Sequence, residues 1–338
     1  MTGDFLKMKH FKTGLLSLAL LTGMAQFSYA DTFNEFLNGV RADLKKQSID
    51  VSIFDKAMVG VEAPQPKVHQ KLKKQPESVF TFSKYLNRLA SDLRIKNGLA
   101  NKEKHLSDLN RIEKEYNLPK EVILALWGVE SAYGELPGDF KIIPSLATLA
   151  YQSHRRDFFR SELIKAVKIV HDGHIPLNDL TGSWAGAMGQ CQFMPSSFYR
   201  FAADGNGDGR KDIWQTEADV FASTANYITQ SGWQNNMPWG EAVTLTKILP
   251  PIKLSSRGLS GERTLKEWRA MGISHKTKKH LDKLTDNTKA RLFMPDGPSK
   301  RSYLVYNNFD VIMKWNYSSY FAFSVLTLAD ALAGKERL

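Results

Sequence analysis

One predicted helix places the strongest constraint on the fold, because it combines an apolar face with an acidic side chain. Asn117 is an N-cap residue type, Pro119 suits the first turn and Gly134 suits the C-cap, so a helix is predicted between them. Apolar side chains recur at helical spacing on one face of this segment: Val122, Ile123, Leu126 and Trp127. Glu130 continues the spacing, so we expect its carboxylate on the same face.

A carboxylate on a buried helix face needs a physical explanation. Removing its charge from water is costly, so such a group is rarely kept without a partner or a chemical role. Burial also disfavours the charged form and raises the pKa, which suits a general acid working near neutral pH. The alternative is structural, with Glu130 held in an ion pair at the end of the helix.

The size and composition of the chain predict a sizeable core that forms without disulfides. Its 338 residues, 42% of them hydrophobic and 11% aromatic, are enough for two domains or one elaborated domain. The single cysteine, Cys191, excludes an intramolecular disulfide. No histidine pairs with it in the sequence, so we expect a small buried residue there rather than a nucleophile.

The first 30 residues have the pattern of a secretory signal. Lys7, Lys9 and Lys12 precede an apolar run over residues 14–25, which is too short to span a membrane stably, and a small-x-small cleavage site ends at Ala30. The alternative is a buried amino-terminal helix. No cysteine near Ala30 could carry a lipid, and no later segment is long and apolar enough to span a bilayer. We therefore expect an exported protein that is not integral to the membrane.

The net charge favours an anionic polymer or surface as partner. It is +11 at pH 7, and removal of residues 1–30 takes away three lysines and one aspartate, which lowers it to +9. Nucleic acid is not predicted, because the basic residues are scattered and no nucleic-acid-binding motif is present.

The pattern along the chain predicts a mainly α (α+β) protein with one β-rich insert. We expect a helical domain over residues 31–115 and a motif-rich helical core over residues 116–240 and 307–338. A small β-rich insert is expected over residues 241–306. Within this insert, strands are predicted at residues 242–249, 290–294 and 302–306. One short helix is predicted at residues 264–271.

A segment rich in glycine and alanine, residues 181–198, follows the acidic helix. Small residues let a backbone approach a ligand closely, and Ser183 and Gln192 offer neutral hydrogen bonds that suit sugar hydroxyls and N-acetyl groups. Pro195 is predicted to start the next helix. The alternative is that the small residues serve only tight packing between helices.

Residues 204–219 resemble an EF-hand loop. Oxygen ligands fall at the expected early positions, with the carbonyl of Arg210 among them: Asp204, Asn206, Asp208, Arg210 and Asp212. Gln215 replaces the usual glutamate, so Asp219 or Glu217 would complete a longer loop. The pattern predicts a structural calcium ion, and the alternative is a glycine-rich turn with Asx caps.

Two aromatic segments complete the set of motifs. Tyr227 lies in Asn-Tyr-Ile, while Asn316 and Tyr320 lie in the run from Lys314 to Phe321. Aromatic rings stack on sugar faces, and asparagine and tyrosine can orient a sugar by hydrogen bonds. Each of these rings could equally belong to the core.

Taken together, the motifs resemble the type B family of lytic murein transglycosylases. The ordered set runs from Glu130 to Tyr320: Glu-Ser-x-Tyr-Gly, Gly-Ser-x-Ala-Gly-Ala-Met-Gly-x-x-Gln-Phe-Met-Pro-Ser-Ser, Asp-Gly-x-Gly-Asp-Gly, Asn-Tyr-Ile and Trp-Asn-x-Ser-x-Tyr. The resemblance implies a lysozyme-like helical core with a cleft, a flanking helical domain and a small β insert. It also implies a soluble, periplasmic member of the family, acting on peptidoglycan glycan strands. Trp315 departs from the tyrosine found in some members.

The resemblance implies a single-acid mechanism on the β-1,4 bond between N-acetylmuramic acid and N-acetylglucosamine. Glu130 would protonate the bridging oxygen and then, as a base, help the muramyl C6 hydroxyl to form a 1,6-anhydro product. No cofactor takes part in this chemistry, and the calcium ion would be structural. The residues implied to bind the glycan near Glu130 are Ser183, Gln192, Tyr227, Asn316 and Tyr320.

Three other functions remain open at this point. A muramidase with the same cleft would use water in place of the C6 hydroxyl. A non-catalytic cell-wall-binding protein would be expected to lack the acid, and Glu130 is present. A calcium-dependent adhesion module would account for the EF-hand-like loop but for none of the other motifs.

Overall fold

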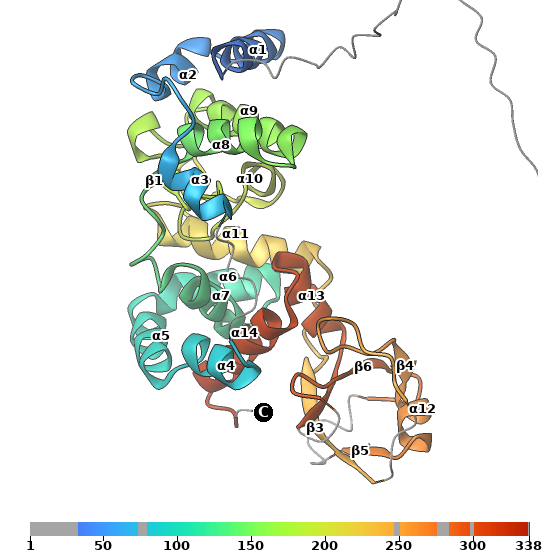
Figure 1. The fold of residues 1–338 in the computed structure, drawn as a ribbon. Helices are drawn as coiled ribbons and strands as arrows, with labels where there is room; N and C mark the ends of the chain where they lie inside the picture. The colour runs from blue at the N-terminus through green and yellow to red at the C-terminus, as the bar shows by residue number, and fades with distance from the viewer. Residues whose placement is uncertain (1–32, 74–79, 247–250, 276–283, 298–300, 337) are drawn as a thin grey trace, which may run out of the picture.

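A computed structural model describes residues 33–73, 80–246, 251–275, 284–297, 301–336 and 338. The predicted secretory signal lies outside these residues. The described chain forms an elongated stack of helices with a small sheet at one end, as Figure 1 shows. This confirms a mainly helical α+β fold. A search of the described helices finds none with the length and apolar character needed to cross a membrane.

The amino-terminal helices contribute to both ends of the stack. In chain order they are α1 (Phe33–Lys46), α2 (Val51–Ala57), α3 (Pro66–Lys73), α4 (Phe82–Leu89), α5 (Asp92–Lys104) and α6 (Leu106–Tyr116). The first two pack against α9 (Arg156–His171) and the third against α8 (Ile142–Gln152). The next two pack against α14 (Ser319–Leu332), and α6 packs against α11 (Glu217–Gln230).

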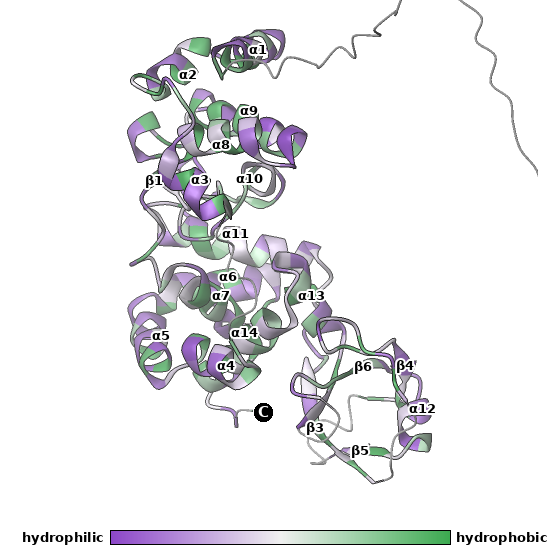
Figure 2. Cartoon of the chain, viewed as in Figure 1, coloured by the Kyte–Doolittle hydropathy of each residue, from purple (hydrophilic) through white to green (hydrophobic). Residues whose placement is uncertain are grey.

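The centre of the molecule is formed by helices that are buried almost all round. α7 (Lys120–Ser131), α8 and α14 bury most of their residues, as expected for helices that are apolar on every face. Figure 2 shows the contrast with outer helices such as α5 and α9, which carry hydrophilic residues as well. The remaining elements of this part are β1 (Phe140–Lys141), η1 (Leu177–Asp179), β2 (Thr181–Gly182), α10 (Pro195–Phe201) and α13 (Asn307–Trp315). α10 begins at Pro195, which confirms the helix start predicted from this proline.

The ends of α7 differ from those predicted. Asn117 does not cap this helix at its start, because it has a left-handed conformation (φ +49°) and ends α6. Pro119 precedes the first helical residue, and the left-handed C-cap is Ala132, two residues before Gly134. Asparagine is one of the few residues besides glycine that adopts this conformation readily, so it can end one helix as well as start another.

The insert is a five-stranded antiparallel sheet with one helix. Its elements are β3 (Gly240–Leu245), β4 (Arg263–Thr264), α12 (Leu265–Ala270), β5 (Ile273–His275), β6 (Lys289–Phe293) and β7 (Ser302–Val305), in the sheet order β4-β6-β7-β3-β5. The three predicted strands and the short helix are confirmed to within a few residues, although residues 247–250 lie outside the description. Thr264 and Glu267 form a capping box that starts α12. A separate small core, centred on Trp268 and Leu292, holds the insert together.

Candidate active site

Glu130 lies in the last turn of α7, next to the loop that joins α13 to α14. Its Oε1 accepts a hydrogen bond of 2.8 Å from the indole Nε1 of Trp315, and its side chain is partly buried. Burial raises the pKa of Glu130 to about 7, and the hydrogen bond from Trp315 opposes this rise. No ion pair to Glu130 occurs among the described residues, so the structural alternative of a salt-bridged helix end does not apply there.

The chain leaves α7 through a turn with a strained backbone, directly after Glu130 and Ser131. Ala132, Tyr133 and Gly134 have successive left-handed conformations with φ of +53°, +63° and +85°. For the two residues other than glycine such conformations are costly and persist only when the surroundings hold them. The hydroxyl of Tyr133 donates to the carbonyl of Arg94 at 2.9 Å. The tyrosine ring packs tightly on Gly128, because a Cβ added to this glycine would lie 2.5 Å from Tyr133 Cζ.

The small-residue segment docks on α7 through a glutamine that the sequence analysis did not single out. The Oε1 of Gln190 accepts a hydrogen bond of 2.7 Å from the indole of Trp127, and its Nε2 donates to the carbonyl of Trp214. A Cβ on Gly134 would lie 2.5 Å from the same Oε1. Close packing therefore accounts for part of the glycine content of this region.

The two polar residues predicted in this segment make local hydrogen bonds. Ser183 Oγ accepts from the backbone N–H of Ala187 at 3.0 Å. Gln192, in a left-handed conformation (φ +52°), donates through Nε2 to the carbonyls of Pro137 and Gly189. These bonds leave the amide oxygen of Gln192 as the group open to a ligand. Neither side chain is a described partner of Glu130.

Two aromatic residues, Tyr227 and Phe193, lie against the indole of Trp315. The ring of Tyr227 lies 4.7 Å from the indole of Trp315, and that of Phe193 lies 5.2 Å from it. The hydroxyl of Tyr227 donates to the carbonyl of Lys314 at 2.6 Å. Trp315 is thus held by tilted ring contacts while its N–H donates to Glu130.

Tyr320 and Asn316 lie next to this group. Tyr320 donates to the carbonyl of Pro295 at 3.2 Å, and its ring lies 5.8 Å from that of Tyr85 on α4. Burial raises the pKa of Tyr85, and the charge of Glu130 raises it further, which places this tyrosine near the acid. Asn316 is exposed beside Trp315, and its side chain makes no hydrogen bond to another described residue.

Sequence reasoning missed two residues of this group. The motifs mark Trp315 only as a departure from a family pattern, and no local signal shows that its indole donates to Glu130, which is 185 residues away. Tyr85 comes from a helix with no recognisable motif, so only the packing of α4 on α14 reveals it.

Among the described residues, no second carboxylate joins Glu130. Glu135 and Asp139, the nearest carboxylates in the sequence after Glu130, are both exposed in the following loop. Within the described residues no other carboxylate affects the pKa of Glu130. The usual pair of glycosidase carboxylates is therefore not seen around this group.

The EF-hand-like loop closes on its own carboxylates. Asp204 accepts backbone N–H groups of Gly207 and Gly209 at 2.7 Å, and the buried Asp219 accepts that of Asp212 at 2.6 Å. Burial raises the pKa of Asp219 to about 6, and the charge of Asp204 adds to the rise. No group of three or more histidine, cysteine, aspartate or glutamate side chains placed to hold a metal occurs in the described parts of the chain.

Two other predicted ligands of the loop also form short-range turns. Asn206 accepts from the backbone N–H of Asp208 at 3.1 Å, and Asp208 accepts from that of Arg210 at 2.9 Å. These are the bonds expected of a turn with Asx caps, and each of these oxygens keeps a second lone pair.

Cys191 is buried, as predicted. Its thiol contacts the carbonyl of Val220 and the hydroxyl of Thr224, and burial raises the pKa of the thiol to about 12. A thiol with so high a pKa carries almost no thiolate at neutral pH, so it is not a nucleophile.

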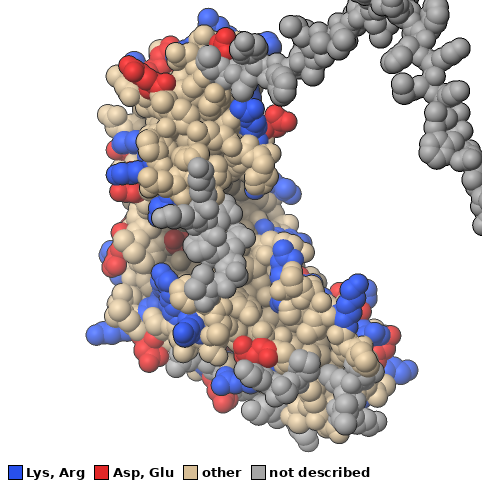
Figure 3. Space-filling model, in the orientation of Figure 1, with Lys and Arg blue, Asp and Glu red and all other residues tan. Residues whose placement is uncertain are grey.

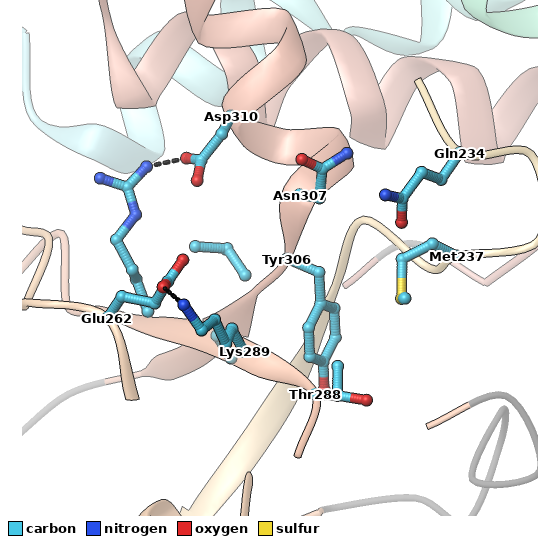
Figure 4. Close-up of a pocket in the computed structure, with 11 residues that line it drawn as sticks. Gln234, Met237, Glu262, Thr288, Lys289, Tyr306, Asn307 and Asp310 are labelled. Atoms are coloured by element: carbon cyan, nitrogen blue, oxygen red, sulfur yellow. Dashed lines mark ion pairs between the residues drawn. The ribbon is translucent and has the colours of Figure 1, made fainter. Parts of the chain in front are cut away.

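The face of the molecule drawn in Figure 3 is hollowed at mid-height, with lysine and arginine side chains along its lower rim. A separate pocket of about 280 Å³ lies between the sheet and the start of α13 (Figure 4). Its charged groups pair with each other, Arg291 with Asp310 and Lys289 with Glu262. Glu130 does not line this second pocket, so the acid and the pocket are different features.

Comparison with known proteins gives a consistent result. The profile of the transglycosylase SLT domain family matches residues 32–330. The membrane-bound lytic murein transglycosylase B of Escherichia coli (strain K12) is 29% identical over 252 residues, 74% of this chain and 67% of that protein.

Two solved structures from Pseudomonas aeruginosa are also similar. SltB3, in complex with NAG-anhNAM-pentapeptide, has a TM-score of 0.81 and 35% identity, covering 91% of this chain and 81% of that one. The soluble lytic transglycosylase SltB1 has a TM-score of 0.73 and 29% identity, covering 88% and 97% respectively.

Proposed function

Because the chain belongs to the transglycosylase SLT family and is a lytic transglycosylase acting on peptidoglycan, we propose that Glu130 is its acid and base. The bond cleaved is the β-1,4 bond between N-acetylmuramic acid and N-acetylglucosamine, and the product carries a 1,6-anhydromuramyl end. The observation that carries the assignment is the environment of Glu130. It is a partly buried carboxyl with a pKa of about 7, bonded to an indole N–H and to no cation among the described residues.

A pKa of about 7 allows Glu130 to work in both directions. The protonated acid gives its proton to the bridging oxygen as the bond from that oxygen to C1 breaks. The acetamido oxygen of the same muramyl residue stabilises the positive charge at C1, which accounts for a site without a second acid. The resulting carboxylate of Glu130 takes the proton of the muramyl C6 hydroxyl, while the oxygen of that hydroxyl forms a bond to C1. Glu130 ends protonated as it began, and no water is consumed.

The glycan is proposed to lie against the five predicted binding residues, which are supported to different degrees. Tyr227 and Tyr320 are supported by their places around Trp315 and Tyr85, close to the acid. Asn316 is supported by its exposure beside Trp315. Ser183 and Gln192 rest on the motif and on the open amide oxygen of Gln192.

Product analysis tests the reaction. Purified protein is incubated with peptidoglycan sacculi and the fragments are weighed by mass spectrometry. We expect fragments one water lighter than those from a hydrolase. Fragments of hydrolysed mass would instead show a muramidase, and the absence of fragments would show a binding protein.

Glu130→Gln tests the residue. It should lower kcat by about a thousandfold or more, because proton transfer is lost while the shape is kept. Glu135→Gln is the matched control, since it makes the same change in the exposed loop just after the helix. Activity of Glu130→Gln close to that of this control would remove Glu130 from the mechanism.

The protein is also proposed to act in the periplasm, where peptidoglycan lies. Support comes from the predicted signal over residues 1–30, which is outside the described residues, and from the net charge of +9 that would remain after its removal. A fusion of these 30 residues to a reporter that is active only after export would test the signal. A reporter that stays inactive would contradict it.

A structural calcium ion is proposed for the EF-hand-like loop. Asp204 and Asp219 bring two carboxylates to one loop, and neither forms an ion pair with a described residue. Asn206 and Asp208 would add further oxygens of the kind calcium prefers. The ion would hold the loop against α11 and take no part in the chemistry.

Thermal unfolding tests the calcium proposal. Saturating calcium should raise the Tm by at least about 3 °C relative to a chelator, because a ligand of the folded state stabilises it. Asp204→Asn should abolish this difference, whereas Asp157→Asn, an exposed aspartate on α9, should keep it. The same Tm with calcium and with chelator would leave the loop as a turn.

A further inference from the structure

A tight turn in the sheet insert carries an arginine whose environment the proposed reaction does not use. The N–H of Gly258 donates to the carbonyl of Ser255 at 2.9 Å, and that of Ser255 donates to Leu259 at 2.8 Å. Gly258 has a φ of +70°. Arg257 occupies the third position of this turn, so its backbone is held in place.

The side chain of Arg257 is held as firmly as its backbone. Its guanidinium lies over the ring of Tyr317, 3.7 Å from the centroid, and its Nε donates to the carbonyl of Tyr317 at 3.0 Å. The hydroxyl of Ser319 donates to the carbonyl of Arg257 at 2.7 Å. These contacts tie the turn to the loop between α13 and α14.

The terminal nitrogens of Arg257 are left without an acidic partner among the described residues. This differs from its neighbours in the insert, because Arg291 pairs with Asp310 and Lys289 with Glu262. Tyr317, which supports the guanidinium, is 70% exposed. An ordered guanidinium with free N–H groups binds a carboxylate well, because the side chain loses little further conformational entropy on binding.

The position of Arg257 relative to Glu130 indicates what the carboxylate belongs to. Tyr317 is two residues from Trp315, so their Cα atoms are within about 7 Å, and Trp315 is bonded to Glu130. Arg257 therefore contacts the same short loop, just after Trp315, that borders Glu130, and a glycan strand extending from Glu130 along this loop would meet the arginine. In peptidoglycan the carboxylates belong to the muramyl residues and to the peptides attached to them.

We propose that Arg257, held on Tyr317, binds a carboxylate of the peptide attached to the glycan strand. This inference rests on the proposed function, since it concerns how the same cleft holds its substrate. It makes the sheet insert a wall of the substrate site, and it makes the enzyme sensitive to the peptides on the strand.

The test measures KM of wild type and of Arg257→Gln on three soluble substrates. The variant keeps a polar side chain of similar reach and removes the charge. The substrates are peptide-bearing glycan fragments, the same fragments with their carboxylates converted to amides, and fragments freed of peptide by an amidase. The matched control is Arg263→Gln, because Arg263 also lies over an aromatic ring of the insert, that of Trp268. Tm values show whether each variant is folded, and Arg257→Lys, which keeps the charge, provides a second variant.

Arg257→Gln should raise KM on the peptide-bearing fragments by about three- to tenfold, the range for one charge-assisted pair at a partly exposed site. It should have little effect on the amidated fragments, and Arg257→Lys should fall between wild type and Arg257→Gln. A rise confined to the peptide-free fragments would assign the ligand to the lactyl carboxylate that the amidase exposes. No rise in KM, an equal rise on all three substrates, or an equal rise in Arg263→Gln would overturn the proposal.

These outcomes are distinct from failure of the proposed function. If the wild-type protein releases no anhydro product, the reaction itself is wrong. If the wild type is active and Arg257→Gln matches it on every substrate, only the role of Arg257 is lost.

Discussion

At the scale of single residues, the pairing of Glu130 with Trp315 determines the chemistry of the site. An indole N–H can donate but cannot accept a hydrogen bond or ionise near neutral pH. Trp315 therefore stabilises the carboxylate form of Glu130 and orients it without competing for its proton. Burial raises the pKa and the indole restrains the rise, so the two effects together leave the group near neutrality.

Trp315→Phe should raise the pKa of Glu130 above about 7, because the variant removes the donor to the carboxylate and keeps the burial. The acid must be protonated to work, so the alkaline limb of the profile of kcat/KM against pH should move up by about one unit. The measurement is that profile for wild type and variant.

Trp239→Phe is a suitable control, because the indole of Trp239 also donates to a carboxylate, that of Asp330, and Asp330 does not affect the pKa of Glu130. It should leave the alkaline limb where it is. If the alkaline limb of the profile does not move in Trp315→Phe either, the indole does not affect the pKa of Glu130.

At the scale of elements, the end of α7 shows why helix caps were harder to predict than the helix. The apolar spacing that predicted the helix is a property of many residues, and it survives small errors at either end. The caps depend on single residues, and here Tyr133 adopts a left-handed conformation because its ring and hydroxyl are held by α5 and α7. Local propensity does not contain that information.

Gly128→Ala should disturb this end of the helix. A Cβ there would lie 2.5 Å from the ring of Tyr133, which is too close, so the tyrosine must move. We expect a loss of about 1 to 3 kcal/mol in the free energy of unfolding, together with lower kcat, because Glu130 is two residues away. Denaturant unfolding and kinetics on the same preparation measure both.

Gly261→Ala is the control for this substitution, since nothing lies within 4 Å of the Cβ it would add. It should be close to neutral in both measurements. Equal stability of Gly128→Ala and Gly261→Ala would mean that Tyr133 is not held as described.

At the scale of the whole molecule, the buried carboxyl of Glu130, the proposed acid, lowers the stability of the fold above neutral pH. Burial raises the pKa of Glu130 from 4.5 to about 7, so between these pH values the folded protein holds a proton that the unfolded chain has released. The stability linked to this group is therefore complete below about pH 4.5 and is lost as the pH rises through about 7. Above that pH the fold contains a partly buried charge.

Glu130→Gln should consequently be more stable than wild type at pH 8, by about 2 kcal/mol after allowance for partial exposure. The difference should shrink toward zero at pH 4, where the wild-type carboxyl is neutral in both states. Urea unfolding at the two pH values measures it, with Glu135→Gln, the same change at an exposed position, as the control. If the stability difference between Glu130→Gln and wild type is the same at pH 8 as at pH 4, the buried-charge account is contradicted.

The sequence by itself determined the mainly helical fold and the sheet insert, and it singled out Glu130 as the proposed acid, because periodic burial and motif order can be read from neighbouring residues. Only the tertiary structure decided which groups surround that acid. Trp315 follows Glu130 by 185 residues, and Tyr85 precedes it on a helix with no motif. Contacts of this kind depend on how α4, α7, α13 and α14 pack together, and packing is set by the shapes of many side chains at once. The position of Arg257 above Tyr317 has the same origin, since it joins a turn of the sheet to a loop of the helical core.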